Sequence, residues 1–327
     1  MNVLIYISWP VQAWCIPDNQ VTALRRAFPE IAFTHTRDQT ETLRAIPDAD
    51  VCFTPFLTPD MVNAATHLRW VHSSAAAVEG LLPLALLAER DVAITNSRGV
   101  QAIPMAEHVM GGLLVLARKY DLTLAAQREH RWIQNELSRE WPWMLHGRTM
   151  TIVGLGTIGL EIARRAHAFG MRVTGVRRRT NELRPEFVDR VVGPDRLADA
   201  LAGCDILVLS APGIAATQRM IGAEQLAMLN PGAVLVNVAR GQVVDDLALQ
   251  HALESGQLGG AVLDVFDREP LESSSPYWTM PNVVITPHSS GFRESHWDDV
   301  VALFSDNLRR FQSGEPLRNV VDAAAGY

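Results

Sequence analysis

The chain has 327 residues, which is long for a single hydrophobic core and therefore predicts two domains. Hydrophobic residues make up 48% and charged residues 20%, as in folded globular proteins, and the net charge of −7 argues against a nucleic-acid partner. The three widely spaced cysteines argue against a disulfide framework or a zinc site and fit a reducing cytoplasm. No apolar run approaches the ~20 residues of a membrane span and no basic leader precedes the first strand, so we expect a cytoplasmic protein without a membrane partner.

The first hundred residues alternate apolar strand patterns with amphipathic helical patterns, which predicts a parallel sheet covered by helices. The expected strands are residues 3–8, 31–36, 50–54, 68–74 and 92–96. A long apolar helix is then expected from Ile103 to Arg128, followed by a polar arm that contains Trp132, Trp141 and Trp143. Tryptophans without regular periodicity in such an arm indicate an interface as readily as an ordinary surface.

A second alternating series begins with the strand pattern TMTIV. Its further strands are expected at residues 171–176, 204–210, 233–239, 259–265 and 282–288. A last helix, from about Glu294 to Ser313, is expected to return to the first sheet, because the tail after it offers the second sheet no further strand. The sequence therefore predicts an α/β fold with two doubly wound parallel-sheet domains. A Rossmann dinucleotide-binding domain (residues 101–289) is inserted into a flavodoxin-like substrate domain (residues 1–100 and 290–327).

The segment GLGTIG follows an apolar strand and precedes a helix with an apolar face. This context makes a G-x-G-x-x-G pattern a dinucleotide signature, whereas the pattern alone could be an ordinary strand–helix turn. Gly154 allows the tight turn, Gly156 lets the backbone approach the pyrophosphate, and Gly159 lets the helix lie close to the strand. The amides of Thr157 and Ile158 stand at a helix N-terminus, which favours an anion.

The next strand ends in Arg177, Arg178 and Arg179, where an NAD site would place an acidic residue. A guanidinium grips a 2′-phosphate that a carboxylate would repel. We therefore expect NADP(H) to be preferred, with NAD(H) possible. The ordinary alternative is a solvated basic loop, but three adjacent arginines at this position of an acidic chain favour the phosphate site.

Three polar residues follow separate strands of the second series: Arg240 in NVARG, Glu269 in DREPL and His288 in TPHSS. Ligands bind at the carboxyl ends of parallel strands. Arg240 could hold a substrate carboxylate and polarise a keto oxygen. His288 could donate a proton to that oxygen, and Glu269 could orient the ring and favour the imidazolium. Alone, His288 would be interpreted as structural, and His72 and His108 are interpreted so because neither has an evident charge partner.

These motifs, in this order, resemble those of the D-isomer-specific 2-hydroxyacid dehydrogenases. The segments GLGTIG, NVARGQVVD, LDVFDREPL, SPYW and ITPHSSG carry the resemblance, which runs nearly end to end and is densest from Asn96 to Gly291. It implies that Arg240 binds substrate, that His288 is the acid/base and that Glu269 is its partner. It also implies cofactor contacts: Asp264 near the nicotinamide amide, Val238 and Ala239 along the ring, and Ala211 and Pro212 at the adenosine part.

In SSAAAVEG the resemblance places a small-residue loop whose Ala76 and Ala77 amides would bind the substrate carboxylate. Ala77 stands where relatives usually have glycine and Glu79 where they usually have aspartate, so this loop departs from the family pattern. The arginine run resembles the NADP-using glyoxylate/hydroxypyruvate reductases. The family is commonly dimeric through the cofactor domain, which would account for the tryptophan arm, so we expect a homodimer.

Trp9, Trp14 and Phe56 follow strands of the first domain and are expected to form an apolar rim. No extra basic cluster is evident there for a substrate phosphate. We expect NADPH-dependent reduction of glyoxylate, hydroxypyruvate or a similar 2-keto acid to the D-2-hydroxy acid. The alternatives are oxidation of phosphite or D-3-phosphoglycerate, or a nucleotide-sensing protein like the C-terminal-binding-protein co-repressors. Formate oxidation is disfavoured, because those enzymes have glutamine where this chain has Glu269.

Overall fold

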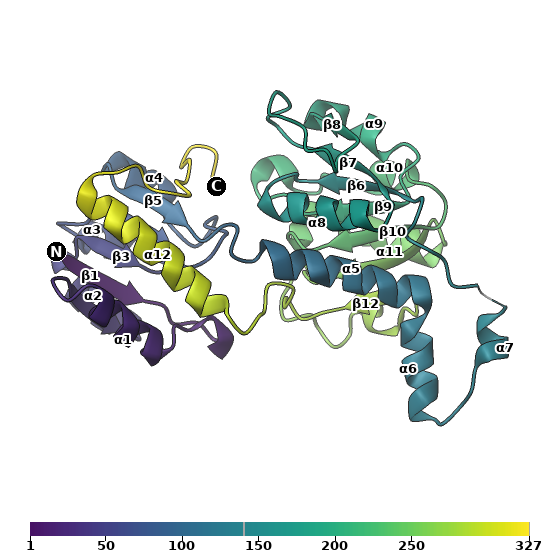
Figure 1. Cartoon of the computed structure of the whole chain (residues 1–327), viewed down its shortest axis with the longest axis horizontal. Coiled ribbons are helices and arrows are strands. Elements are labelled where there is room, and N and C mark those ends of the chain that lie inside the picture. The colour runs from purple at the N-terminus through teal and green to yellow at the C-terminus, as the bar shows by residue number, and fades with distance from the viewer. Residues whose placement is uncertain (140, 327) are drawn as a thin grey trace. The chain divides into compact units, whose positions relative to one another are not determined.

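The computed structural model describes residues 1–139 and 141–326, which form two compact units. The first unit comprises Met1–Gln101 and the residues from Phe292 onward, drawn in purple, blue and yellow in Figure 1. The second comprises Ala102–Gly291, drawn in teal and green. Each unit is built on one sheet, so the fold is two parallel-sheet α/β domains, as predicted. Within the described residues, no helix combines the length and the apolar character needed to cross a membrane.

The first unit has a five-stranded parallel sheet in the order β2-β1-β3-β4-β5. This is the flavodoxin-like order. Every residue of β3 and β4 is buried, because helices cover both faces, and these strands therefore lack polar alternation. The strands are β1 (Asn2–Tyr6), β2 (Ala32–Thr36), β3 (Val51–Phe53), β4 (Trp70–Ser73) and β5 (Ala93–Asn96).

Helices cover this sheet in two separate hydrophobic layers. On one face, α1 contributes Leu24 and α12 contributes Phe304 to the core. On the other face, α3 contributes Met61 and α4 contributes Leu87. The last helix of the chain thus packs in the first unit, as its position in the sequence predicts. The helices are α1 (Asp18–Ala27), α2 (Gln39–Ala45), α3 (Pro59–Ala64), α4 (Leu84–Glu89) and α12 (His296–Ser313).

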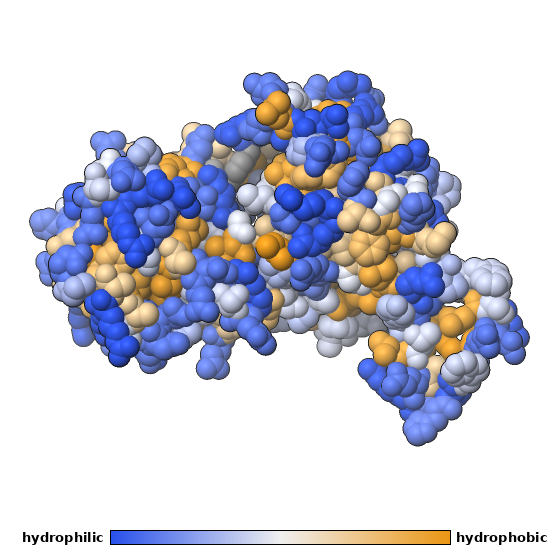
Figure 2. Space-filling view, in the orientation of Figure 1, coloured by the Kyte–Doolittle hydropathy of each residue, from blue (hydrophilic) through white to orange (hydrophobic). Residues whose placement is uncertain are grey.

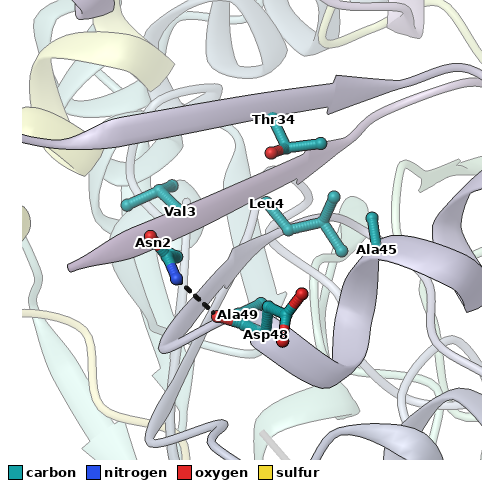
Figure 3. Close-up of a pocket in the computed structure, with 7 residues that line it drawn as sticks. All are labelled: Asn2, Val3, Leu4, Thr34, Ala45, Asp48 and Ala49. Carbon is teal, nitrogen blue, oxygen red and sulfur yellow. Dashed lines mark hydrogen bonds between the residues drawn. The ribbon is translucent and has the colours of Figure 1, made fainter.

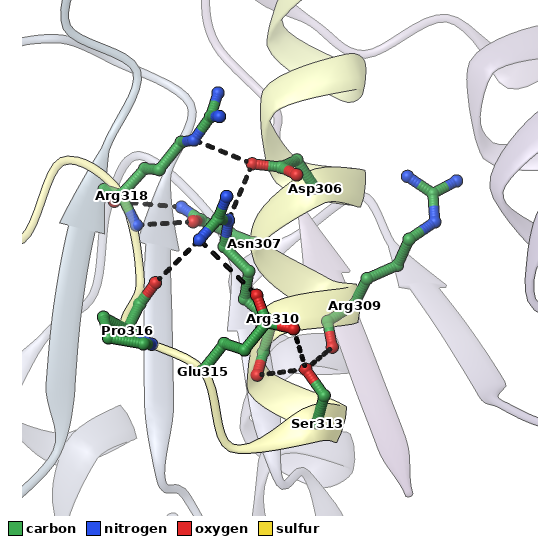
Figure 4. A network of polar contacts seen from close by, with 8 residues as sticks. All are labelled: Asp306, Asn307, Arg309, Arg310, Ser313, Glu315, Pro316 and Arg318. Atoms are coloured by element: carbon green, nitrogen blue, oxygen red, sulfur yellow. Dashed lines mark hydrogen bonds and ion pairs between the residues drawn. The ribbon is translucent and has the colours of Figure 1, made fainter.

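The C-terminal tail is fastened to this unit by a buried asparagine (Figure 4). The fully buried Asn307 of α12 donates from Nδ2 to the Arg318 carbonyl at 3.0 Å and accepts from the Arg318 amide at 2.8 Å. Beyond Arg318, the Asn96 amide donates to the Asn319 carbonyl and the Val321 amide to the Ile94 carbonyl. The tail therefore covers the open edge of β5, which would otherwise expose unpaired backbone groups.

The second unit has a seven-stranded parallel sheet in the order β12-β11-β10-β9-β6-β7-β8. Counted from β6, this is the Rossmann order with one added strand. The edge strand β8 was not predicted, because RVV is too short to stand out from its polar surroundings. The strands are β6 (Thr149–Val153), β7 (Arg172–Val176), β8 (Arg190–Val192), β9 (Ile206–Leu209), β10 (Ala233–Asn237), β11 (Leu258–Leu263) and β12 (Val283–Ile285).

Helices again cover both faces. Leu113 of α5 and Ile162 of α8 lie in one hydrophobic layer, and Leu226 of α10 and Leu249 of α11 lie in the other. The apolar face expected for the helix after the glycine turn is confirmed. The helices are α5 (Ala102–Arg118), α6 (Tyr120–Arg128), α7 (Gln134–Leu137), α8 (Thr157–Ala168), α9 (Leu197–Leu201), α10 (Ala223–Ala227) and α11 (Asp246–Glu254).

The single helix expected from Ile103 to Arg128 is wrong, because the chain breaks it at Lys119. Lys119 adopts a left-handed conformation with φ of 56°, and α6 leaves the axis of α5 there (Figure 1). The Trp143 amide donates to the Ala117 carbonyl at 2.9 Å, so a segment far along the chain occupies an acceptor at the end of α5. No glycine or proline marks this break in the sequence.

The three tryptophans of the polar arm differ in how much of each side chain is exposed. Trp143 is partly buried against the core, with Arg148 over its ring, so it also has a packing role within the unit. Trp132 and Trp141 are 89% and 78% exposed. Residue Glu140 of this arm lies outside the described residues.

Candidate active site

Three neighbouring strands bring the predicted polar trio to one edge of the second sheet. Arg240 follows β10, Glu269 follows β11 and His288 follows β12, and these strands are adjacent in the order β12-β11-β10. Their carboxyl ends therefore meet at one place. Nδ1 of His288 lies 2.7 Å from Oε2 of Glu269. The sequence spacing alone could not show that contact.

Glu269 is held in place by both carboxylate oxygens. Oε1 accepts from the Phe266 amide at 2.9 Å, while Oε2 takes the His288 ring. Partial burial works against ionisation, but the hydrogen bonds from His288 and Phe266 and the nearby charges of His288 and Arg240 outweigh it, so the pKa of Glu269 lies below its ordinary value. A carboxylate beside His288 therefore persists throughout the neutral range.

Arg240 lies at the end of β10 in a tightly fixed backbone. The Asn237 side chain accepts from the Ala239 amide and donates to the Arg240 carbonyl, which closes a small loop around the arginine. Gly241 follows because a Cβ there would overlap the backbone of Phe266. This close approach brings the loop after β10 against the loop after β11, and so places Arg240 beside the Glu269 loop.

The turn that carries His288 is built around the fully buried carboxylate of Asp264. The Thr286 hydroxyl donates to this carboxylate at 2.6 Å, and the amides of Ser289 and Ser290 donate at 2.8 and 3.0 Å. His288 itself has a φ of 51°, a strained conformation for a residue with a side chain. Asp264, which the resemblance places near the nicotinamide, thus holds the turn of His288.

His108, interpreted from the sequence as structural, lies beside the turn of His288. Its Nε2 lies 3.0 Å from the Thr286 hydroxyl and 3.9 Å from the Asp264 carboxylate. Because that hydroxyl donates to Asp264, the Nε2–H of His108 donates to the hydroxyl. No local pattern could have revealed this contact, since α5 and β12 are far apart in the chain.

The glycine turn has the geometry of a dinucleotide cradle. Gly154 has a φ of 101°, and a Cβ there would lie 2.5 Å from the Ala211 nitrogen. A Cβ on Gly159 would overlap the Gly154 carbonyl, whereas one on Gly156 would meet no described atom within 4 Å. The space above Gly156 opens at the N-terminus of α8, where Thr157 begins the helix. These residues fit a bound pyrophosphate.

Further predicted cofactor residues lie on the strands beside this turn. Ala211 and Pro212 follow β9, and Ser210 donates to the Gly154 carbonyl at 2.8 Å. Val238 and Ala239, both buried, follow β10. The structure thus places them at the edge that carries the glycine turn and the polar trio.

The arginine run begins next to the glycine turn, because the amides of Gly154 and Leu155 both donate to the Val176 carbonyl. Arg177 turns inward: its side chain is only 10% exposed, lies 3.3 Å from the Glu182 carboxylate and donates to two backbone carbonyls. Arg178 and Arg179 are exposed. Arg177 therefore braces the following loop, a role that the sequence did not indicate.

The loop with Ala76 and Ala77 follows β4 in the first unit. Asn96 donates to the Ala76 carbonyl at 2.7 Å, and the Ser97 amide donates to the Ala75 carbonyl at 3.1 Å. Within residues 1–139 and 141–326, the amides of Ala76 and Ala77 have no hydrogen-bond acceptor. The Glu79 carboxylate accepts from the Val78 amide. The loop thus has fixed carbonyls and unpaired amides, as a carboxylate-binding loop requires.

The expected apolar rim is partly engaged in packing. Trp14 lies edge-on to Phe292 at 4.7 Å and to His296 at 5.0 Å, while Trp9 and Phe56 remain partly exposed. A separate pocket of about 270 Å³ lies at the amino end of β1, where Asn2 donates to the Asp48 carbonyl (Figure 3). Asp48 is its one ionisable lining residue, and ligands of such sheets bind at the opposite, carboxyl edge, so this pocket is not the candidate site.

Comparison with known proteins identifies the family whose motifs the sequence resembles. A family model described as "D-isomer specific 2-hydroxyacid dehydrogenase, NAD binding domain" matches residues 110–290. The chain is 36% identical over 238 residues to glyoxylate/hydroxypyruvate reductase B of Pectobacterium carotovorum, covering 72% of this chain and 73% of that protein. It is 30% identical to a D-3-phosphoglycerate dehydrogenase of Methanocaldococcus jannaschii, but spans only 55% of that protein's length.

Solved structures match over nearly the whole chain. A D-isomer specific 2-hydroxyacid dehydrogenase family protein from Aeromonas salmonicida is 33% identical with a TM-score of 0.83, covering 98% of this chain and 99% of that one. An NADPH-dependent glyoxylate/hydroxypyruvate reductase from Sinorhizobium meliloti, in complex with NADP and sulfate, is 29% identical with a TM-score of 0.83 and full coverage of both chains. The protein therefore belongs to the D-isomer-specific 2-hydroxyacid dehydrogenase family.

Proposed function

We propose that the protein reduces a small 2-keto acid, such as glyoxylate or hydroxypyruvate, to the D-2-hydroxy acid with NADPH. The observation that carries this proposal is the 2.7 Å contact between His288 and Glu269 on strands adjacent to that of Arg240. The glyoxylate reductase names of several relatives support the substrate class. In this proposal the second unit binds the cofactor and the first unit is the substrate domain.

Each polar residue then has a distinct role. Arg240 grips the substrate carboxylate and polarises the carbonyl oxygen. His288 donates a proton from Nε2 to that oxygen while Nδ1–H remains bonded to Glu269, whose carboxylate orients the ring. The Ala76 and Ala77 amides add a second hold on the carboxylate. NADPH supplies the hydride and would lie along the glycine turn, with Val238, Ala239, Ala211 and Pro212 at its edge.

Initial rates with purified protein test this function. We expect oxidation of NADPH with glyoxylate, hydroxypyruvate or phenylpyruvate, and a kcat/KM that falls by roughly 10²-fold or more in Arg240→Ala, because a charged anchor is lost in the transition state. The matched control is Arg268→Ala, which removes the same charge from an exposed side chain paired with Glu272.

Turnover of phosphite or D-3-phosphoglycerate without turnover of keto acids would replace the proposed substrate. An Arg240→Ala variant as active as Arg268→Ala would remove Arg240 from the mechanism.

We further propose that NADP(H) is preferred because Arg178, with Arg177 behind it, faces the 2′-phosphate. In Arg178→Asp, the ratio of kcat/KM for NADPH to that for NADH should fall at least about tenfold, since a carboxylate repels the phosphate. Arg179→Asp makes the same charge change one residue further along the exposed part of the run and should alter the ratio less. Equal effects in the two variants would indicate a diffuse positive field in place of a phosphate site.

The variant Glu269→Gln tests the contact between Glu269 and His288. The substitution removes the carboxylate that accepts from Nδ1 of His288, so kcat/KM for the keto acid should fall roughly tenfold or more while the KM for NADPH stays unchanged. Because the pKa of Glu269 itself is lowered, its ionisation should impose no decline in activity between about pH 5 and pH 7.

Glu272→Gln is the control, since Glu272 lies in the same loop but pairs with Arg268. A kcat/KM in Glu269→Gln equal to that in Glu272→Gln would contradict the pairing role.

We also propose a homodimer that buries the segment from α6 to the residues after α7 (residues 120–139 and 141–144). Figure 2 shows apolar side chains at the surface of this segment, at the lower right. The exposed large apolar residues include Tyr120, Leu124, Trp132, Trp141 and Met144. Such a cluster is more apolar than an ordinary surface.

Sedimentation equilibrium should show a dimer, and replacing both Trp132 and Trp141 by alanine should weaken its association at least tenfold. Trp278→Ala, which removes a 52% exposed tryptophan elsewhere in the second unit, should leave association unchanged. A monomeric wild type, or equal weakening by Trp278→Ala, would contradict this interface.

A further inference from the structure

A second histidine, His72 on β4, is fully buried in the first unit and is not part of the polar trio. Its ring lies among the rings of Phe53, Trp70 and Phe304, at centroid distances of 5.5, 5.9 and 5.5 Å. This apolar surrounding disfavours the imidazolium and lowers the pKa of His72 to about 3. The ring is therefore neutral at physiological pH, with one nitrogen as donor and the other as acceptor.

The hydrogen-bond partners decide which nitrogen carries the proton. On one side, the Thr95 hydroxyl lies 2.6 Å from Nδ1 and accepts from the Trp70 indole at 2.8 Å, so its own proton points to Nδ1. On the other side, the Ser97 hydroxyl donates to the Ser73 carbonyl at 2.9 Å and lies 3.4 Å from Nε2. Because the Ser97 hydroxyl already donates its proton to Ser73, its oxygen acts as an acceptor toward the ring, and Nε2 is the donor. The Nε2–H tautomer satisfies both contacts together.

This chain ends on the loop that contains Ala76 and Ala77. Ser97 holds two of the loop's carbonyls, because its hydroxyl donates to Ser73 and its amide donates to Ala75. The Ser73 hydroxyl in turn accepts from the Ala75 amide at 3.2 Å. With these carbonyls fixed, the next amides along the loop keep a defined direction. The Nε2–H of His72 is what orients the Ser97 hydroxyl toward Ser73.

We propose that His72 is a positioning residue for substrate binding: as the neutral Nε2–H tautomer it directs Ser97 to hold the loop whose Ala76 and Ala77 amides bind the substrate carboxylate. The proposal rests on the proposed function for the identity of the ligand, but the network itself is a property of the first unit. It assigns to a buried, uncharged histidine an effect on substrate affinity and none on proton transfer.

The kinetic test compares His72→Leu, His72→Gln and Ser97→Ala. The loop holds the carboxylate in the ground state and the transition state alike, so its loss should raise KM and leave kcat nearly unchanged. We expect the KM for the keto acid to rise roughly three- to tenfold in His72→Leu and Ser97→Ala, with the KM for NADPH unchanged. Glutamine offers one donor and one acceptor, so His72→Gln should recover most of the affinity.

The control for general loss of stability is Thr42→Val. Thr42 is a fully buried residue of the same unit whose hydroxyl pairs with that of Thr36 at 2.8 Å, away from the loop. This variant should lower the melting temperature without changing the KM for the keto acid. A KM that rises equally in Thr42→Val, or a His72→Gln variant as impaired as His72→Leu, would overturn the proposal.

A measurement without turnover separates this inference from the proposed reaction. Nitrogen-15 chemical shifts of the His72 ring at neutral pH distinguish the Nε2–H tautomer from the Nδ1–H tautomer and from imidazolium, and either of the latter would overturn the proposal. In His72→Leu, the Ala76 and Ala77 amide signals should shift or broaden while those of α1 do not. Suppose that the wild type shows the expected tautomer, and His72→Leu the expected amide response, while the wild type reduces no keto acid. In that case the proposed function fails and the positioning of the loop stands.

Discussion

The arrangement of the candidate site depends on one buried carboxylate. Asp264 is fully buried, and it accepts from the Thr286 hydroxyl and from the amides of Ser289 and Ser290. A carboxylate without solvent is costly unless such donors surround it. The three donors come from the turn that carries His288, so the requirement to satisfy Asp264 fixes that turn, including the strained φ of His288. The placement of His288 against Glu269 therefore depends on the burial of Asp264. In the sequence this residue is only the aspartate of the segment LDV, and nothing there shows that it is buried.

Two histidines, His288 and His72, lie in very different surroundings. His288 is 48% exposed and lies against the Glu269 carboxylate, whose own pKa is lowered. His72 lies among aromatic rings with hydroxyl partners, and its pKa is lowered to about 3. One ring is thus half exposed beside a carboxylate, and the other is enclosed and neutral. In the sequence the two residues look alike, since each belongs to an expected apolar strand, at residues 68–74 and 282–288.

Much of the fold follows from the sequence because parallel strands buried on both faces are nearly continuous apolar runs. The same rule located the site, since Arg240, Glu269 and His288 each follow such a run and parallel strands share a carboxyl edge. Where the outcome depends on which partners a side chain or a helix end meets, the sequence carries no signal. The inward turn of Arg177 depends on the fold of its own loop around Glu182, whereas the helix break at Lys119 involves Trp143, which lies far along the chain. The contact of His108 with Thr286 is of the same kind.

The candidate acid–base pair and the candidate substrate loop lie in different units of the chain. The His288–Glu269 pair, the buried Asp264 and the glycine turn all lie within Ala102–Gly291. The loop with the unpaired amides and the His72 network lie within the first unit. Under the proposed function, substitutions in the first unit would change which acid is held without touching the contact between His288 and Glu269. Ala77 and Glu79, which differ from the residues that the family resemblance leads us to expect, lie in that loop, and the proposed function places any difference in substrate choice there.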